Sequence, residues 1–281
     1  MTKTLRKIRA LARDEKTFYQ RRDVDIDPAL ASVVQRIRHE LKASGIAKVE
    51  GFWSREKALK WGEDLSQECR VRAEGRNPET ITAGRPVTGT DDIQVFAGGT
   101  RWNRVEKEYP VLMPEFGEHP LVKAAATLYW GRCKVERLAF QENFPDQSLN
   151  HMLSEGKRYE AGLGRGWHVD TWAHSLKALL LLSDVSEENG PFQHVSGTHR
   201  LAFSMDSLLF LRMSWPVVPP DPLVQSHLYL DEDQSRRIEK RRDIVAGTGR
   251  AGTLYLADTR AFHRAKPVIL GARRVLWNYL A

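Results

Sequence analysis

Near residue 134 the amino-acid pattern changes from helical periodicity to a series of strand-like segments. On the N-terminal side, apolar residues recur at helical spacing in 28–42, 54–72 and 119–130, and a short strand is predicted at 46–52. On the C-terminal side, strands are predicted at 134–144, 167–172, 176–185, 193–195, 252–257 and 273–280. Helices followed by many short strands indicate an α+β, mainly β fold, in which the strands form an antiparallel jelly roll and the N-terminal helices pack outside it.

Residues typical of helix caps mark the ends of the predicted helices. Asp27 is expected to cap the first helix, with Pro28 at its first helical position and Gly45 at its end. Ser54 is expected to cap the second helix, and Gly131 to close the third.

The length of 281 residues suits one large domain or two small ones, and we expect a single domain. Its parts are a basic N-terminal extension at 1–27, a helical part at 28–133 and the jelly-roll core at 134–281. Two long irregular stretches, 145–166 and 203–250, interrupt the core. Irregular stretches of this length in a compact domain are commonly lids or carry small elements of their own, and we expect lid-like loops.

The formal net charge is +7, but acidic residues are interleaved with the basic ones along the chain. The densest basic clusters, 3–13 and 236–242, carry no nucleic-acid-binding motif, so nucleic acid is not the expected partner. A positive surface also suits an anionic small molecule. A small-molecule substrate is therefore the expected partner, and the sequence leaves the oligomeric state open.

Apolar runs and cysteines indicate the cellular compartment. No apolar run approaches the ~20 residues of a membrane-spanning helix, and the first residues do not resemble a secretory signal, so no contact with a membrane is expected. Cys69 and Cys133 lack a CxxC partner, which favours free thiols in a reducing cytoplasm. The sequence also permits a disulfide between them.

The segment 166–172, GWHVDTW, carries the sharpest chemical pattern. Residues two apart on a strand project from the same face, so His168 and Asp170 would lie side by side as metal ligands. His263, just after the predicted strand 252–257, is the candidate third ligand. Two histidines and one carboxylate leave three positions of an octahedral metal free, an arrangement typical of non-haem iron(II) oxygenases.

An HxD triplet alone is a weak signal, because it occurs by chance in many proteins. Zinc would also accept two histidines and an aspartate. The metal-capable His194 and Asp258 lack the spacing that aligns a pair of ligands, so we expect them to support the ligands or the fold, and a structural role is also the expectation for His199. A nucleophilic GxSxG motif and a P-loop are absent from the sequence.

The order of motifs around the triplet resembles the phytanoyl-CoA dioxygenase-like branch of iron(II)- and 2-oxoglutarate-dependent oxygenases. The matching stretches are WHVD at 167–170, 184–192 with its ENGPF turn, GTHR at 197–200, and 263–274. The N-terminal stretches GIAKVEGFWSREKA and HPLVKAAATLYWG also fit, so the resemblance covers roughly residues 28 to 281.

This resemblance implies a double-stranded β-helix, the cupin-like form of the jelly roll. It implies that iron(II) is held by His168, Asp170 and His263, and that 2-oxoglutarate and dioxygen are cosubstrates. It does not imply a particular substrate, because this branch acts on many.

The distal carboxylate of 2-oxoglutarate requires a cationic partner, and the planar fork of a guanidinium matches a carboxylate well. Arg273 and Arg274 lie where the family carries its arginine, and on a strand only one of them can face the barrel. If this chain lacks one loop residue relative to the family, the family's arginine aligns with Arg273; without a gap it aligns with Arg274. We expect Arg273 to bind the distal carboxylate. An arginine in this role argues against a zinc hydrolase.

Further candidates flank the predicted metal ligands. Gln141 lies on the strand at 134–144 and is a candidate contact to the cosubstrate, with Asn143 on the same face. Trp172 shares a strand face with the metal ligands, and Arg165 lies in the lid-like loop before them; both are candidate substrate contacts.

The expected reaction is hydroxylation of a C–H bond of a small polar or anionic metabolite, such as an amino acid, a sugar or a natural-product intermediate, with release of succinate and carbon dioxide. Asp170 favours hydroxylation, because halogenating relatives carry Gly or Ala there. Desaturation, epimerisation and cyclisation stay open, as does a non-catalytic binding protein on the same fold.

Overall fold

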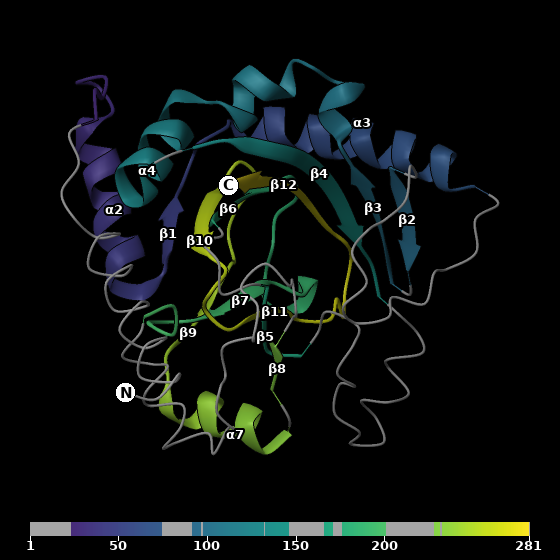
Figure 1. Cartoon of the computed structure of the whole chain (residues 1–281). Helices are drawn as coiled ribbons and strands as arrows, with labels where there is room; N and C mark the ends of the chain where they lie inside the picture. Colours follow the sequence, from purple (N-terminus) through teal and green to yellow (C-terminus); the bar gives the residue numbers. More distant parts are fainter. Residues whose placement is uncertain are drawn as a thin grey trace, which may run out of the picture.

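The computed structural model describes residues 24–74, 92–96, 98–131, 133–145, 166–170, 176–200, 228–230 and 232–280. Within these residues two antiparallel β-sheets face one another, and helices lie on their outer sides (Figure 1). The predicted mainly β fold with external helices is thereby confirmed.

The larger sheet consists of β1 (Ile46–Val49), β2 (Ile93–Phe96), β3 (Gly99–Asn103), β4 (Val135–Asn143), β6 (Leu176–Leu181), β10 (Leu254–Asp258) and β12 (Arg273–Leu280). Their order in space is β1-β10-β6-β12-β4-β3-β2. The smaller sheet consists of β5 (His168–Val169), β7 (Phe192–Val195), β8 (Leu228–Tyr229), β9 (Ile244–Ala246) and β11 (His263–Ala265). Their order is β8-β5-β11-β7-β9, so strands from distant parts of the chain alternate, as a jelly roll requires.

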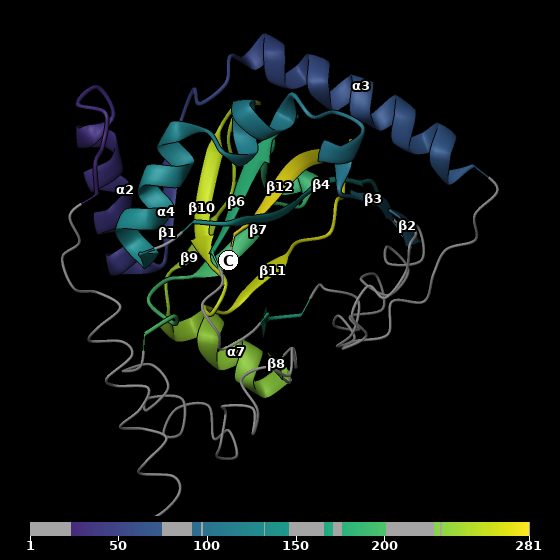
Figure 2. The same cartoon turned by 45° about the horizontal axis from the view of Figure 1, so that its top comes forward.

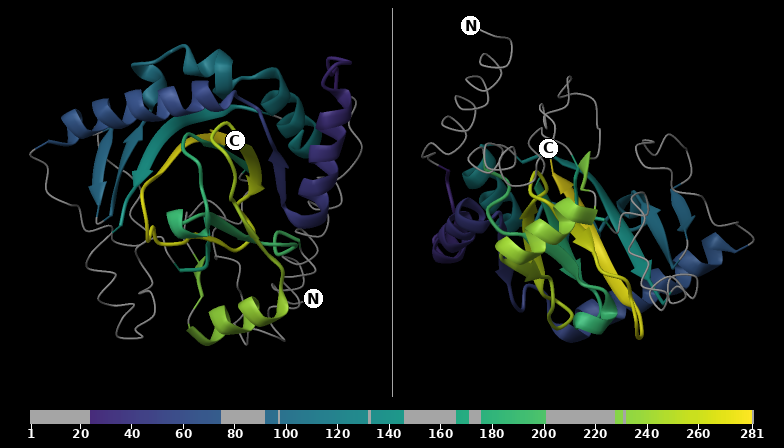
Figure 3. Two further views of the ribbon diagram at one scale, coloured as in Figure 1. Left: turned by 180° about the vertical axis from the view of Figure 1, so that it is seen from behind. Right: turned by 90° about the horizontal axis from the view of Figure 1, so that it is seen from below.

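Three helices cover the outer face of the larger sheet, and one lies outside the smaller sheet (Figures 2 and 3). The first three are α2 (Ala31–Ser44), α3 (Arg55–Ala73) and α4 (Pro120–Trp130), and the fourth is α7 (Glu232–Arg241). Short helical turns occur at η1 (Val105–Lys107), η2 (Met113–Gly117) and η3 (Glu187–Asn189). None of the helices within the described ranges has both the length and the apolar character needed to cross a membrane.

The capping predictions are confirmed except at the start of the first helix. Ser54 accepts a hydrogen bond from the backbone N–H of Lys57, and Gly45 and Gly131 end their helices at φ 84° and 88°. Asp27 does not cap α2, which begins three residues later than predicted, at Ala31. The Asp27 carboxylate instead accepts from the backbone N–H of Ala29, which stabilises a turn before the helix.

The stretch 203–250 differs from the predicted lid-like loop. Its described residues, 228–230 and 232–250, contain β8, α7 and β9, and β8 and β9 are the two edge strands of the smaller sheet. All three elements are short, and α7 is polar: its only apolar residue is Ile238, which is 2% exposed. The remainder of this stretch, 203–227, and residues 146–165 lie outside the described residues.

Side-chain alternation along β12 separates two apolar layers. Leu276 and Leu280 pack beneath the helices, in the same cluster as residues of α2, α3 and α4. Val275 faces the barrel interior and packs in a cluster with Phe192 of the smaller sheet, against which Trp277 also packs. Burial of each such large apolar side chain contributes about 1.5–3 kcal/mol, so both layers stabilise the larger sheet. Cys69, on the buried face of α3, and Cys133 are both free thiols, as predicted.

A buried carboxylate ties α3 to the larger sheet. Glu142 on β4 has a side chain only 1% exposed and accepts hydrogen bonds from Ser66 and Arg70 of α3 and from Arg274 of β12. Burial by itself would raise the pKa of Glu142, but the hydrogen bonds from Arg70, Arg274 and Ser66 outweigh it and lower the pKa from its ordinary value of 4.5. Glu142 is therefore an ionised crosslink between helix and sheet.

We expect Glu142→Gln to lower the free energy of unfolding at neutral pH by about 3 kcal/mol, because it leaves Arg274 without its buried counter-charge. A carboxyl whose folded-state pKa is depressed stabilises fully above its ordinary pKa, and this stabilisation is lost as the pH falls through the folded-state pKa. The difference between wild type and variant should therefore shrink below pH 4.5. Urea denaturation at a series of pH values measures the free energy of unfolding of both proteins, and hence this difference.

Arg70→Gln is the matched control. The Arg70 side chain is 60% exposed, so its loss should cost less than about 1 kcal/mol. Equal stabilities of wild type and Glu142→Gln at neutral pH would contradict the crosslink.

Candidate metal centre

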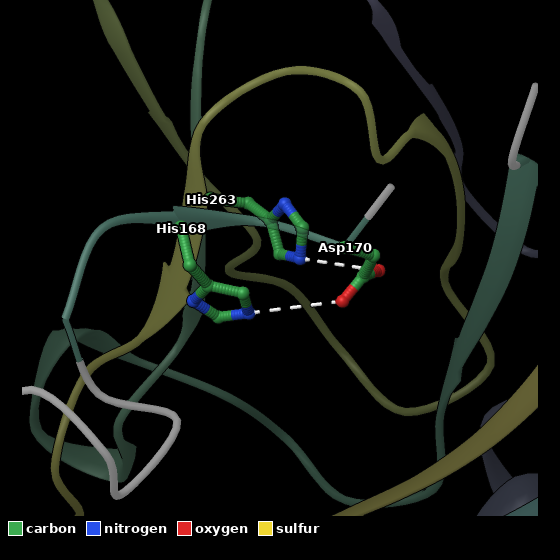
Figure 4. Close-up of side chains that lie close together, drawn as sticks. All are labelled: His168, Asp170 and His263. Carbon is green, nitrogen blue, oxygen red and sulfur yellow. Dashed lines mark ion pairs between the residues drawn. The ribbon is translucent and has the colours of Figure 1, made fainter. Parts of the chain in front are cut away.

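The predicted metal ligands come from two neighbouring strands of the smaller sheet. His168 opens β5 and His263 opens β11, and the antiparallel register places these two residues directly opposite one another. Asp170 follows β5, and its backbone N–H donates to the carbonyl of Thr259 at 3.3 Å. Short as β5 is, the two-residue spacing still brings Asp170 beside the histidines, as Figure 4 shows.

Three ligand atoms converge. His168 Nε2 lies 3.8 Å from Asp170 Oδ1, and His263 Nε2 lies 3.5 Å from Asp170 Oδ2. The ligand atoms of all three residues lie within 4.8 Å of one another. Ligands about 2.1 Å from one ion, at adjacent corners, would be ~3 Å apart, so a small contraction would seat a divalent cation.

Backbone carbonyls orient both imidazoles. His168 Nδ1 lies 2.8 Å from the carbonyl oxygen of Gly166, and His263 Nδ1 lies 2.9 Å from that of Ala261. A carbonyl only accepts, so in the neutral ring Nδ1 carries the hydrogen and Nε2 keeps its lone pair. Hydrogen bonds of this kind are the usual support for metal-binding histidines.

The carboxylate of Asp170 is held in its charged form. Burial alone would raise its pKa, but the positive charge of Lys177 is the largest opposing effect, and the pKa lies well below its ordinary value of 3.8. Lys177 Nζ lies 2.5 Å from Asp170 Oδ2. Lys177, on β6, therefore faces the site.

The other metal-capable residues surround the triad without joining it. His194 on β7 pairs with His263 across the sheet, and burial lowers its pKa to about 3, so its imidazole is neutral. Burial also lowers the pKa of His199, to about 4. Asp258 forms a buried ion pair with Arg260 and accepts from the Tyr129 hydroxyl of α4 at 2.8 Å. These contacts give all three the character of structural groups.

The two adjacent arginines of β12 face opposite sides of the larger sheet. Arg273, 3% exposed, donates from Nη2 to Asn143 Oδ1 at 2.8 Å and from Nη1 to the carbonyl of Gly190. Arg274 points under α3, where Glu142 and Glu63 bind it. Arg273 is thus the arginine on the barrel side.

Amide side chains of β4 connect Arg273 to a second arginine. Gln141 Nε2 donates to Asn143 Oδ1 at 2.8 Å, and Gln141 Oε1 accepts from Arg101 Nε and Nη2 at 3.1 and 2.7 Å. Gln141 lies on the barrel side of the sheet, and its amide positions Arg101.

Sequence reasoning did not single out Arg101, Trp277 or Tyr279, which also face the barrel. The period of two along β12, continued from Arg273, was a usable signal for the two aromatic residues. Arg101 carried no such signal, because its place beside Gln141 depends on the pairing of β3 with β4. The predicted substrate contacts Trp172 and Arg165 lie outside the described residues.

No family model matches the chain, and no curated protein matches its sequence. Solved structures share its fold. The alpha ketoglutarate dependent epimerase SnoN from nogalamycin biosynthesis is 15% identical, with a TM-score of 0.56 over 90% of this chain and 84% of that one. The carbocyclase SnoK from the same biosynthesis is 15% identical, with a TM-score of 0.55 over 88% of this chain and 83% of that one.

EctD from S. alaskensis, crystallised with bound Fe, is 15% identical and has a TM-score of 0.53, covering 87% of this chain and 75% of that one. SnoN has also been crystallised with Fe3+, alpha ketoglutarate and nogalamycin RO, and EctD with 2-oxoglutarate and 5-hydroxyectoine. At such identities the likeness concerns the fold, and it confirms the jelly-roll core with its external helices.

Proposed function

We propose that the chain is an iron(II)- and 2-oxoglutarate-dependent oxygenase of the phytanoyl-CoA dioxygenase-like branch. The observation that carries the proposal is the convergence of His168, Asp170 and His263, with both histidine Nε2 atoms turned toward the ionised carboxylate. The motif order of the sequence supports the branch, and the fold shared with SnoN, SnoK and EctD supports the general class.

The donor set fits iron(II). Two neutral imidazoles and one carboxylate are the ligands of the facial triad in non-haem iron(II) oxygenases, and they leave three positions for a chelating cosubstrate and dioxygen. The carbonyls of Gly166 and Ala261 hold the rings in the required tautomer, so the residues are arranged before any ion binds.

Arg273 is the proposed partner of the distal carboxylate of 2-oxoglutarate. Its guanidinium is buried on the barrel side, and Asn143 and the Gly190 carbonyl hold it in place. A buried, pre-oriented guanidinium binds a carboxylate by charge-assisted hydrogen bonds and loses little side-chain freedom in doing so. Arg274 serves the helix–sheet crosslink instead.

Iron(II) with 2-oxoglutarate and dioxygen supplies the oxidising power to remove hydrogen from an unactivated C–H bond, with release of succinate and carbon dioxide. The protein's share is to hold the metal ligands, to anchor the cosubstrate at Arg273 and to exclude water with the apolar interior formed by Val275 and Phe192.

Hydroxylation of a small polar or anionic metabolite in the cytoplasm is the proposed reaction, because a carboxylate stands at position 170, where halogenating relatives have none. The fold is also that of an epimerase and a carbocyclase. Mass spectrometry of the product separates these outcomes: hydroxylation adds one oxygen atom, epimerisation leaves the mass unchanged, and desaturation or oxidative ring closure removes two hydrogen atoms.

One contact favours a second function, a non-catalytic small-molecule-binding protein. The Lys177 ammonium, 2.5 Å from Asp170 Oδ2, neutralises the carboxylate without a metal. In that case the triad would be an ion-pair network and the barrel a binding pocket. Metal affinity distinguishes the two functions.

Asp170→Ala and His263→Ala should each lower the affinity for Fe(II), measured by anaerobic titration, by at least about a hundredfold, because each removes a ligand outright. Iron-dependent release of succinate on admission of oxygen should disappear in both. His39→Ala, which removes an exposed histidine of α2, should change neither quantity. Wild-type protein that binds no divalent metal, with or without 2-oxoglutarate, would leave only the binding-protein function.

Arg273→Gln should weaken 2-oxoglutarate binding about ten- to a hundredfold, because it removes charge-assisted hydrogen bonds to the distal carboxylate. Arg274→Gln should leave the affinity within about threefold, since its side chain faces α3, while lowering stability through Glu142. Titration calorimetry in the absence of oxygen, with Mn(II) in place of iron, measures the 2-oxoglutarate affinity of both variants. A loss of affinity confined to Arg274→Gln would reverse the assignment.

A further inference from the structure

Three cationic side chains lie on the barrel face of the larger sheet, and one of them, Lys177, contacts a candidate metal ligand. Lys177 on β6 and Arg137 on β4 are both paired with Tyr279 of the strand between them. Lys177 Nζ lies 4.8 Å and the Arg137 guanidinium 4.0 Å from the centre of the Tyr279 ring. Cations at these distances are attracted by the aromatic face, so Tyr279 positions both.

Arg101 is the third member of this cationic cluster. Two hydrogen bonds to Gln141 fix its guanidinium on the same face of the sheet. Its charge reaches Tyr279: burial would raise the pKa of this phenol, but Arg101, Lys177 and Arg137 reverse the effect and lower it. Arg101, Arg137 and Lys177 are each half-buried, so solvent reaches the cluster.

The cluster contains more positive than negative charge. Asp170 supplies a carboxylate to this cluster, through its ion pair with Lys177. Within the described ranges Arg101 and Arg137 form no ion pair. Arg137 Nε is a buried donor without an acceptor among the same residues. Like charges gathered in a partly desolvated site repel one another unless a counter-charge lies between them. By contrast, Arg274 on the opposite face has two carboxylate partners.

The proposed cofactors do not supply the missing negative charge. The two positive charges of iron(II) and the one of Arg273 would balance the negative charge of Asp170 and the two of 2-oxoglutarate. Asp170 would then no longer neutralise Lys177, so Lys177, Arg101 and Arg137 would all lack a counter-charge. A neutral substrate would leave these charges unpaired, whereas an anionic one would be bound by all three.

We propose that Arg101, Arg137 and Lys177 form an oxyanion subsite for the substrate, which therefore carries a phosphate or carboxylate group. The substrate class rests on the proposed oxygenase function; the anion subsite itself does not. Lys177 links the two sites, because it contacts the ligand Asp170, so the anionic group would be held close to the carbon that reacts.

The test is calorimetric titration of the full-length protein at low ionic strength with inorganic phosphate and, separately, with acetate. Arg137→Gln and Arg101→Gln should each weaken binding of the preferred anion by at least about tenfold, because each removes charge-assisted hydrogen bonds. Tighter binding of phosphate assigns a phosphorylated substrate, and tighter binding of acetate a carboxylic acid. Lys177 is left unchanged because it touches a proposed metal ligand.

Two controls separate charge from folding and from overall electrostatics. Arg137→Lys keeps the charge but loses the planar fork, so it should weaken binding less than Arg137→Gln does. Arg55→Gln removes one charge from an exposed arginine of α3 and should change the affinity by less than about twofold. Arg273→Gln should still bind the anion, which shows that the probe does not report the proposed cosubstrate site.

The subsite is overturned if neither anion binds wild-type protein, or if Arg101→Gln and Arg137→Gln bind it as wild type does. Fe(II) and 2-oxoglutarate binding, measured on Arg137→Gln, should match wild type. Anion binding that depends on Arg137, in a protein without affinity for iron, would remove the oxygenase and keep the subsite. Binding of iron and 2-oxoglutarate without binding of either anion would remove the subsite and keep the oxygenase proposal.

Discussion

The candidate site depends on the antiparallel pairing of β11 with β5, which sets His263 directly opposite His168. Side chains of directly opposed residues project from the same face of a sheet, and a slip of one residue would turn His263 away from Asp170. This pair is supported on both sides, because β7 continues the sheet beyond β11 and β8 continues it beyond β5. The edge strands β8 and β9 thus contribute to the site through the register they stabilise, although they provide none of the three ligands.

The same period of two divides the larger sheet into a structural face and a chemical face. Toward the helices, Leu276, Leu280 and the crosslinked Glu142 attach α3 and its neighbours to the sheet. Toward the barrel, Arg273, Trp277 and Tyr279 stand along the same strand. Adjacent residues therefore differ completely in role: Arg274 neutralises a buried carboxylate, and Arg273 points into the interior. A fold with this alternation can change its interior chemistry while keeping the packing that holds the helices.

Local patterns in the sequence predicted those features that depend on a few neighbouring residues. The helix ends at Gly45, Ser54 and Gly131 and the strand 273–280 follow from capping and alternation, and the structure has them. The HxD spacing predicted that His168 and Asp170 lie side by side, motif order added His263, and the structure brings the three residues together. Features without a clear local pattern were missed: α2 begins at Ala31, α7 has a single apolar residue, and its flanking strands are only two and three residues long. Arg101 was missed for the same reason, since only the pairing of β3 with β4 places it beside Gln141.

Asp170 connects the metal centre with the cationic cluster, because its carboxylate faces two histidines on one side and Lys177 on the other. A cation bound between the histidines competes with the Lys177 ammonium for the same oxygen, and an anion bound at the cluster competes with Asp170 for Lys177. Metal binding therefore frees Lys177 for the anion, and anion binding frees Asp170 for the metal. The metal and the anion should consequently bind with positive cooperativity. Linkage makes this coupling reciprocal. An ionised aspartate paired with a lysine thus provides a physical reason for an anionic substrate and a metal to assemble in one site.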